Sequence, residues 1–150
     1  MVLKKHQLHG YRKMERFYSK INKDKLVFCI LRKDEITAKR VDLSPDDEFM
    51  QVCGRVMSKG THVPAHKHIE THRKSNLTQE SWVVLQGEVE AKFYDLDNST
   101  LCTRRIKSGD VLVLYRGGHS MTVIDDQTIF YEFKNGPYYG VSKDKEKIDE

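Results

Sequence analysis

A chain of 150 residues is long enough for one domain with its own hydrophobic core. Its 26 Lys and Arg against 22 Asp and Glu give a net charge of only +4, with the basic residues scattered, so we expect no nucleic-acid partner. The sequence has no apolar run of membrane-spanning length, no signal-peptide pattern and no CxxC pair among its three cysteines, so we expect reduced thiols, no membrane partner and a cytoplasmic location.

Turn residues divide most of the chain into short segments of strand length. Residues 1–24 are predicted to form an N-terminal arm or a short helix, and residues 141–150 a charged C-terminal tail. Between them, in residues 25–140, the expected strands are KLVFCILR, ITAKRVDL, EFMQVCGRVM, SWVVLQG, EVEAKFYD, TLCTRRIKSG, VLVLYRGG, HSMTVID and TIFYEFKNG. Many short strands at regular spacing predict an all-β antiparallel sandwich or barrel.

The segment HVPAHKHIETH, residues 62–72, holds four of the seven histidines. Side chains alternate between the two faces of a strand, so on a strand His66 and His68 would point the same way. Two imidazoles in that arrangement can bind one divalent ion from one side. The alternative interpretation is a partly exposed polar strand that binds no metal.

The spacing of other residues extends this pattern. Gly60 precedes the HKH of residues 66–68 by five residues, and Glu80 precedes Gly87 by six. Further on, Gly109 is followed by five residues and then by YRGGH, which ends at His119. This arrangement resembles the two-part motif of the cupin superfamily. In that family the first part reads G, five residues, HxH, three or four residues, E, six residues, G, and the second reads G, five residues, PxG, two residues, H, three residues, N.

The resemblance implies a double-stranded β-helix, the jelly-roll cupin barrel. It also implies one divalent transition metal, held by His66, His68, Glu80 and His119. Three imidazoles and one carboxylate suit Fe, Mn, Ni, Co, Cu or Zn. With four protein ligands in an octahedral shell, two positions would be left for water, substrate or dioxygen.

The sequence departs from the family pattern at several positions. Eleven residues separate His68 from Glu80 instead of three or four, and residues 69–79 are therefore predicted to form an insertion at the opening of the barrel. His119 comes one residue early, while Tyr115 and Val123 replace the Pro and Asn of the motif.

The long gap makes Glu70 an alternative ligand to Glu80. Residues i and i+4 of a strand lie about 13 Å apart, so Glu70 could not join His66 at one ion without a bend in the strand. We favour Glu80, which opens an apolar strand on which Glu80, Trp82 and Val84 share one face. His72 is interpreted as a residue of the loop or of the pocket rim.

Other polar residues are candidates for contacts with a substrate. Tyr115 and Arg73 are the candidate catalytic residues: Tyr115 could donate a hydrogen bond, and Arg73, with Lys74, could bind a carboxylate or phosphate from the insertion. Gln51 and Arg55 are candidate polar groups of the pocket. For each of these residues a solvated or structural role is the alternative.

The leading hypothesis for function is a metal-dependent enzyme that acts on a small polar molecule, sugar-like or carboxylate, by oxygenation, isomerisation or lyase chemistry. The alternatives are a non-catalytic binding or sensing module, a metal-independent sugar-nucleotide epimerase or isomerase with a His base and a Tyr acid, and a barrel with a decayed site. TQESWVVLQG, GGH and GPYYGVSKDK also resemble, more loosely, cupins linked to cell-surface polysaccharide and sugar metabolism. Small cupins commonly dimerise, which leads us to expect a homodimer.

Overall fold

Strands make up nearly all of the regular structure in residues 14–149, the part of the chain that the computed structural model describes. The strands are Glu15–Tyr18 (β1), Leu26–Leu31 (β2), Val41–Asp42 (β3), Cys53–Gly54 (β4), Glu80–Gln86 (β5), Glu88–Tyr94 (β6), Thr100–Lys107 (β7), Val111–Leu114 (β8), Gly118–Val123 (β9) and Ile129–Lys134 (β10). The helices are one 3-10 turn, Lys33–Glu35 (η1), and one α-helical turn, Val141–Asp144 (α1). The predicted all-β antiparallel class is confirmed. None of the helices in this part of the chain has the length and apolar character needed to cross a membrane.

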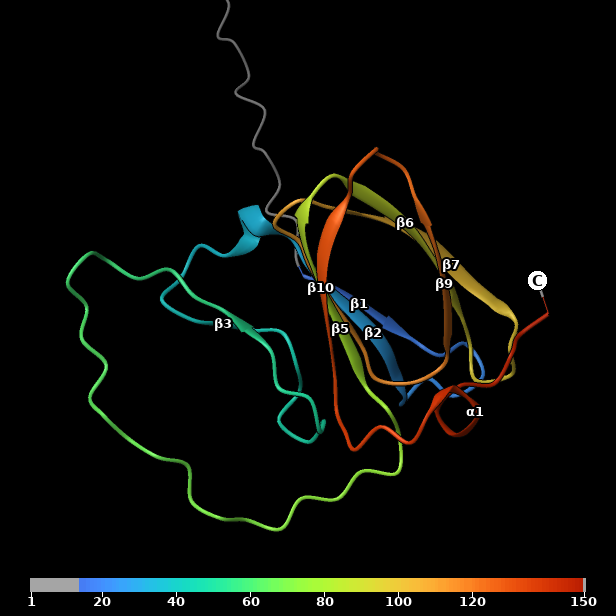
Figure 1. Ribbon diagram of the computed structural model, residues 1–150, viewed down its shortest axis with the longest axis horizontal. Coiled ribbons are helices and arrows are strands. Elements are labelled where there is room, and N and C mark those ends of the chain that lie inside the picture. Colours follow the sequence, from blue (N-terminus) through green and yellow to red (C-terminus); the bar gives the residue numbers. More distant parts are fainter. Residues whose placement is uncertain (1–13, 150) are drawn as a thin grey trace, which may run out of the picture.

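The strands form two main sheets that face each other (Figure 1). One sheet has five strands in the order β1-β2-β8-β5-β10, and the other has three in the order β7-β6-β9. Every strand pair is antiparallel, including the short β3–β4 pair, which forms a two-stranded sheet of its own.

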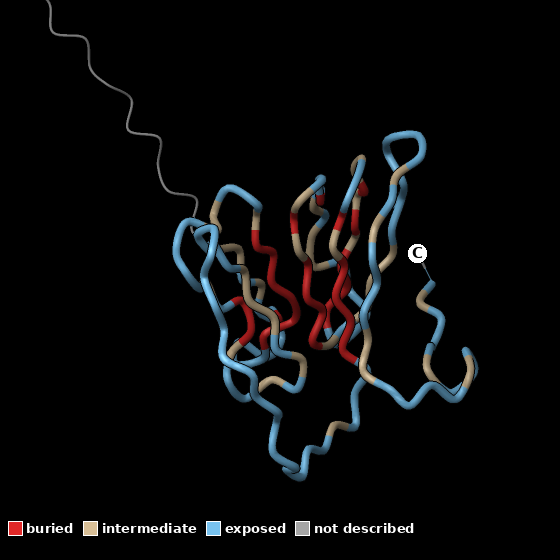
Figure 2. The backbone as a smooth tube through the Cα atoms, turned by 60° about the vertical axis from the view of Figure 1, so that its left-hand side comes forward, coloured by how far each residue is buried: buried red, intermediate tan, exposed pale blue. Residues whose placement is uncertain are grey.

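The core fills the space between the two sheets, where the buried residues of Figure 2 concentrate. Phe28 of β2 lies at its centre, stacked between Phe17 at 4.2 Å and Phe93 at 3.7 Å between ring centroids. Phe17 comes from β1 and Phe93 from β6, so this stack joins the five-stranded sheet to the three-stranded one.

A second cluster covers the outer face of the five-stranded sheet. Cys29, Val113 and Tyr115 lie there fully buried, under Leu43 and the partly buried Val52 of the segment that carries β3 and β4. With apolar contacts on both faces, all six residues of β2 are buried. This explains why the segment reads as a continuous apolar run rather than an alternating one.

The two sheets are joined on one side and open on the other. On the joined side Glu15 of β1 pairs with Arg104 of β7 at 3.2 Å. On the other side β9 and β10 each end their sheet with no further strand among the described residues. Met121 and Val123 of β9 are 37% and 53% exposed there, although the residues paired with them on β6 are buried. Residues paired across two strands share a face, so part of the inner face beside β9 is uncovered.

Residues 55–79 contain no strand, and all but two of them are exposed. The segment, green in Figure 1, swings away from both sheets, and its course is also apparent in Figure 2. The prediction of a strand carrying His66 and His68 is therefore wrong for this structure. ITAKRVDL and EFMQVCGRVM were expected to form full strands, but only two residues of each do so.

The predicted chain ends also differ from the structure. Residues 15–18, within the expected N-terminal arm, form β1 and pair with β2, while residues 1–13 lie outside the described part. The charged tail begins with α1 and then runs past one end of β9 (Figure 1).

Candidate functional site

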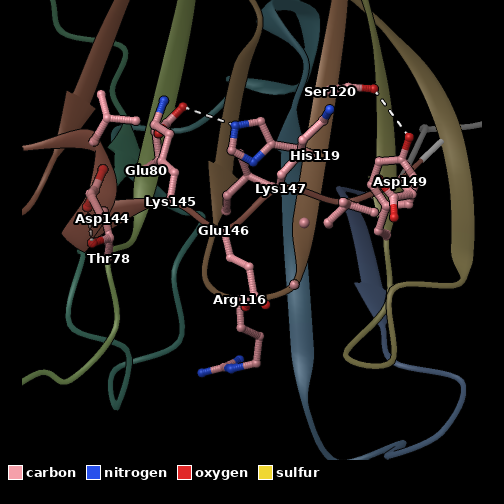
Figure 3. Close-up of a pocket in the computed structure, with 16 residues that line it drawn as sticks. Thr78, Glu80, Arg116, His119, Ser120, Asp144, Lys145, Glu146, Lys147 and Asp149 are labelled. Atoms are coloured by element: carbon pink, nitrogen blue, oxygen red, sulfur yellow. Dashed lines mark hydrogen bonds and ion pairs between the residues drawn. The ribbon is translucent and has the colours of Figure 1, made fainter.

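Two of the four predicted metal ligands lie next to each other. Glu80 is the first residue of β5 in the five-stranded sheet, and His119 is the second residue of β9 in the three-stranded sheet. Their side chains face each other from the two sheets, with His119 Nε2 3.5 Å from Glu80 Oε1 (Figure 3). The Glu80 side chain is 8% exposed and that of His119 is 28% exposed, so a small ligand can reach the pair from the histidine side.

Trp82 completes the immediate surroundings of Glu80. Its Nε1 donates a hydrogen bond to Glu80 Oε1 at 2.5 Å, and its ring meets the His119 ring edge-on at 5.2 Å. Burial alone would raise the pKa of Glu80, but the contact with His119 and the Trp82 hydrogen bond outweigh it and lower the pKa below its ordinary value. Glu80 is therefore held as a carboxylate.

The pair opens into a pocket of about 870 Å³. Its wall combines residues at the ends of β5, β6 and β9 with the C-terminal tail, whose residues 144–149 all line it (Figure 3). Tyr94 and Ser120 bring two hydroxyl groups to the pocket, 3.5 Å apart. The pocket thus offers the Glu80 carboxylate, an imidazole, two hydroxyls, and both the lysines and the carboxylates of the tail, which suits a small polar ligand.

A hydrogen-bonded cluster next to the pocket fixes the chain positions from which the pair projects. The Glu48 carboxylate accepts two hydrogen bonds from Arg116 Nη2, at 2.7 and 3.0 Å, and one from Gln79 Nε2 at 2.7 Å. Arg116 also donates to the carbonyl of Leu26. Gln79 directly precedes Glu80, and Arg116 precedes His119 by three residues. The Glu48 carboxylate therefore links the chain segment before Glu80 to the segment before His119.

His66 and His68 lie elsewhere, in the exposed 55–79 segment. Their ring centroids are 5.7 Å apart, and His66 Nδ1 lies 2.9 Å from the carbonyl of Pro64. In residues 14–149 no group of three or more His, Cys, Asp or Glu side chains is arranged to hold a metal ion. The structure therefore brings together Glu80 and His119 as one pair and His66 and His68 as another.

The remaining predicted site residues do not line the pocket. Tyr115 is fully buried on the outer face of the five-stranded sheet and donates to Ser44 Oγ at 2.9 Å, and burial raises its pKa. Arg73 is exposed in the 55–79 segment, where it contacts the carbonyl of Thr71 at 3.4 Å. Arg55 is exposed, and Gln51 donates to the backbone carbonyls of residues 45 and 48.

The sequence did not predict Tyr94 and the tail, which line the pocket, or Glu48, which lies next to it. Tyr94 could have been found from the register, since it pairs with Gly118, next to His119. Glu48 lies in a turn segment rich in acidic residues, where nothing in the sequence distinguishes it. The tail was noted only for its charge.

Comparison with protein-family profiles, curated proteins and solved structures finds no match to this chain.

Proposed function

We propose that this chain is a metal-binding protein of the cupin type, with a jelly-roll barrel, that acts as a metal-dependent enzyme on a small polar molecule. The observation that carries the proposal is the Glu80–His119 pair, a buried carboxylate facing an imidazole 3.5 Å away in a pocket. A carboxylate and an imidazole are two of the four ligands that the cupin motif implies. A bound divalent ion would polarise ligand oxygens or activate dioxygen.

In this proposal His66 and His68 supply the other two ligands. Exposed strand edges and an uncovered apolar inner face are features that a protein normally covers, and both occur at β9 and β10. Residues 57–76 make hydrogen bonds only within their own segment among the described residues, so little holds them where they are. Twelve residues of extended chain span about 40 Å, so His68 has ample reach to Glu80.

We also propose that the open edges pair in a homodimer. The outward-facing side chains of β10, Ile129, Tyr131 and Phe133, are 50–57% exposed and form an apolar strip on an edge strand. Light scattering during size exclusion should give twice the 17.6 kDa of one chain. A monomer at micromolar concentrations would contradict the dimer and would leave the metal site unaffected.

The decisive experiment is elemental analysis of untagged full-length protein purified without added metal. We expect close to one transition-metal ion per chain. Glu80→Gln should weaken metal binding about 100-fold or more, because even groups that only orient a ligand are worth 10- to 100-fold. Glu70→Gln is the matched control, since Glu70 lies in the exposed segment and should leave the metal content unchanged.

A metal content near zero that Fe, Mn, Ni, Co, Cu or Zn does not restore would refute the metal proposal. A larger loss in Glu70→Gln than in Glu80→Gln would place the carboxylate ligand in the 55–79 segment. Oxygen consumption and product formation with a panel of sugars and small carboxylic acids, measured on the loaded protein, then separate an enzyme from a binding module.

A second candidate function is favoured by the same pair. An imidazole beside a buried carboxylate is the arrangement of a general base, and the Tyr94 hydroxyl in the same pocket could act as the acid of a metal-independent epimerase or isomerase. The lysines at 145 and 147 would face the phosphates of a sugar nucleotide. Epimerase or isomerase activity that survives exhaustive chelation would select this candidate over the metal-dependent one.

A further inference from the structure

The last residues of the chain lie in the pocket next to the Glu80–His119 pair. Asp144, at the end of α1, accepts a hydrogen bond from Thr78 Oγ1 at 2.8 Å and lies 3.7 Å from Lys134 Nζ. These contacts fix the point from which residues 145–149 cross the pocket, with Lys145 beside Glu80 (Figure 3). The tail is thus anchored at its start and free to lie over the site beyond that anchor.

Ile148 is the only apolar residue between positions 142 and 150, and it is half-buried, whereas residues 145–147 and 149 are exposed. Its Cδ1 occupies the space where the Cβ of any residue other than glycine at position 118 would be. Gly118 directly precedes His119 on β9, so the seat for Ile148 lies on the opposite face of that strand from the imidazole, and the tail passes over the end of β9 to reach it. Because Gly118 has no side chain, the Ile148 side chain fits against the backbone there, and this contact attaches the tail to β9.

Few other contacts within the described part of the chain hold residues 145–149 in place. Among hydrogen bonds between described residues, residues 145–149 make only one, from the Lys145 amide to the Val141 carbonyl at 2.9 Å. This bond continues α1 and does not reach either sheet. A segment held by one apolar contact opens at a small cost in free energy compared with the fold as a whole.

We propose that residues 145–149 are a displaceable cover of this pocket, latched by Ile148 in the seat that Gly118 leaves open. The tail forms one wall of the cavity beside the Glu80–His119 pair, so its release would widen the access of a ligand to the pair. The inference rests on the proposed function only in taking this pocket as the ligand site. The latch itself requires no metal.

The test is carbethoxylation of histidines by diethyl pyrocarbonate in full-length, chelator-treated protein, with the rate at each histidine read by peptide mass spectrometry. His119 has a measurable starting rate because 28% of its side chain is exposed with the tail in place. His66 and His68, already exposed, serve as internal references.

Ile148→Asp should raise the rate at His119 by about tenfold, a factor that corresponds to losing a half-buried isoleucine contact. The reference histidines should not change. Lys143→Ala is the matched control, because Lys143 is an exposed tail residue that does not line the pocket. Circular dichroism of each variant confirms that the sheets remain folded.

Gly118→Ala tests the seat itself. It should also raise the rate at His119, and adding it to Ile148→Asp should give no further increase, because both changes release the same latch. An unchanged rate in Ile148→Asp, an equal rise in Lys143→Ala, or additive effects of the two latch variants would overturn the proposal. None of these outcomes depends on metal content, so a failure here is distinct from a failure of the metal proposal.

Discussion

Substitution of Glu48 tests how much the hydrogen-bonded cluster of Glu48, Gln79 and Arg116 contributes to stability next to the candidate site. Glu48→Ala removes both hydrogen bonds to Arg116 and the one to Gln79, and leaves a guanidinium that is 17% exposed without its counter-ion. Removing one partner of a buried pair costs about 3 to 5 kcal/mol. Because some solvent reaches Arg116, and because it keeps its bond to the Leu26 carbonyl, we take the lower end, about 3 kcal/mol.

The measurement is equilibrium unfolding in urea, followed by circular dichroism, for the wild-type protein and Glu48→Ala. A loss of about 3 kcal/mol corresponds to a fall in Tm of roughly 10 °C for a domain of this size. Glu48→Gln should give an intermediate loss, since its amide keeps one acceptor for Arg116 but presents a donor to the Gln79 donor.

Asp42→Ala is the matched control. The Arg40–Asp42 pair is shorter, at 2.6 Å, but both side chains are about half exposed. Surface pairs contribute little, so its unfolding curve should overlay the wild-type curve. If Glu48→Ala cost no more than Asp42→Ala, burial would not be what gives the Glu48 cluster its strength, and the reasoning would be refuted.

Two further predictions concern the core. Phe28→Ala should lower the free energy of unfolding by about 4 kcal/mol, because it removes the central ring of a three-ring stack. Tyr139→Ala, at a ring that is 71% exposed, should leave the free energy of unfolding unchanged. Similar losses in the two variants would contradict the assigned core. Burial raises the pKa of the Cys29 thiol from 9.0 to about 11, so the folded state keeps a proton that the unfolded chain releases. The corresponding stability, about 3 kcal/mol, is present below pH 9.0 and lost as pH rises towards 11, and the loss should be smaller in Cys29→Ala; parallel stability–pH curves would refute it.

The C-terminal half of the fold was predictable from the sequence. Between Glu80 and Lys134 every expected strand is present, because apolar or alternating runs of strand length are separated there by short segments of turn residues. The choice of Glu80 over Glu70 rested on the limited reach of a strand, and the structure places Glu80 next to His119 and Glu70 in the exposed segment. The metal that would join these residues remains a prediction.

The N-terminal half was less predictable because its segments depend on partners distant in sequence. β1 carries Glu15 and Arg16 and reads as polar, yet pairs with a fully buried strand. The HKH segment has strand-like spacing but no neighbouring strand in the described chain, and spacing alone does not supply backbone partners. The Ile148 latch depends on the absence of a side chain at Gly118, thirty residues earlier, which no local pattern reveals.

The single tryptophan gives the site its own optical probe. Trp82 is 2% exposed, its indole N–H is bound to the Glu80 carboxylate, and its ring edge lies against His119. Any event that redistributes charge on that pair alters the electronic environment of the indole directly. Steady-state emission of the unlabelled protein therefore reports on this one indole beside the pair, free of background from other tryptophans, and can be followed during titration with metals, small acids or sugars.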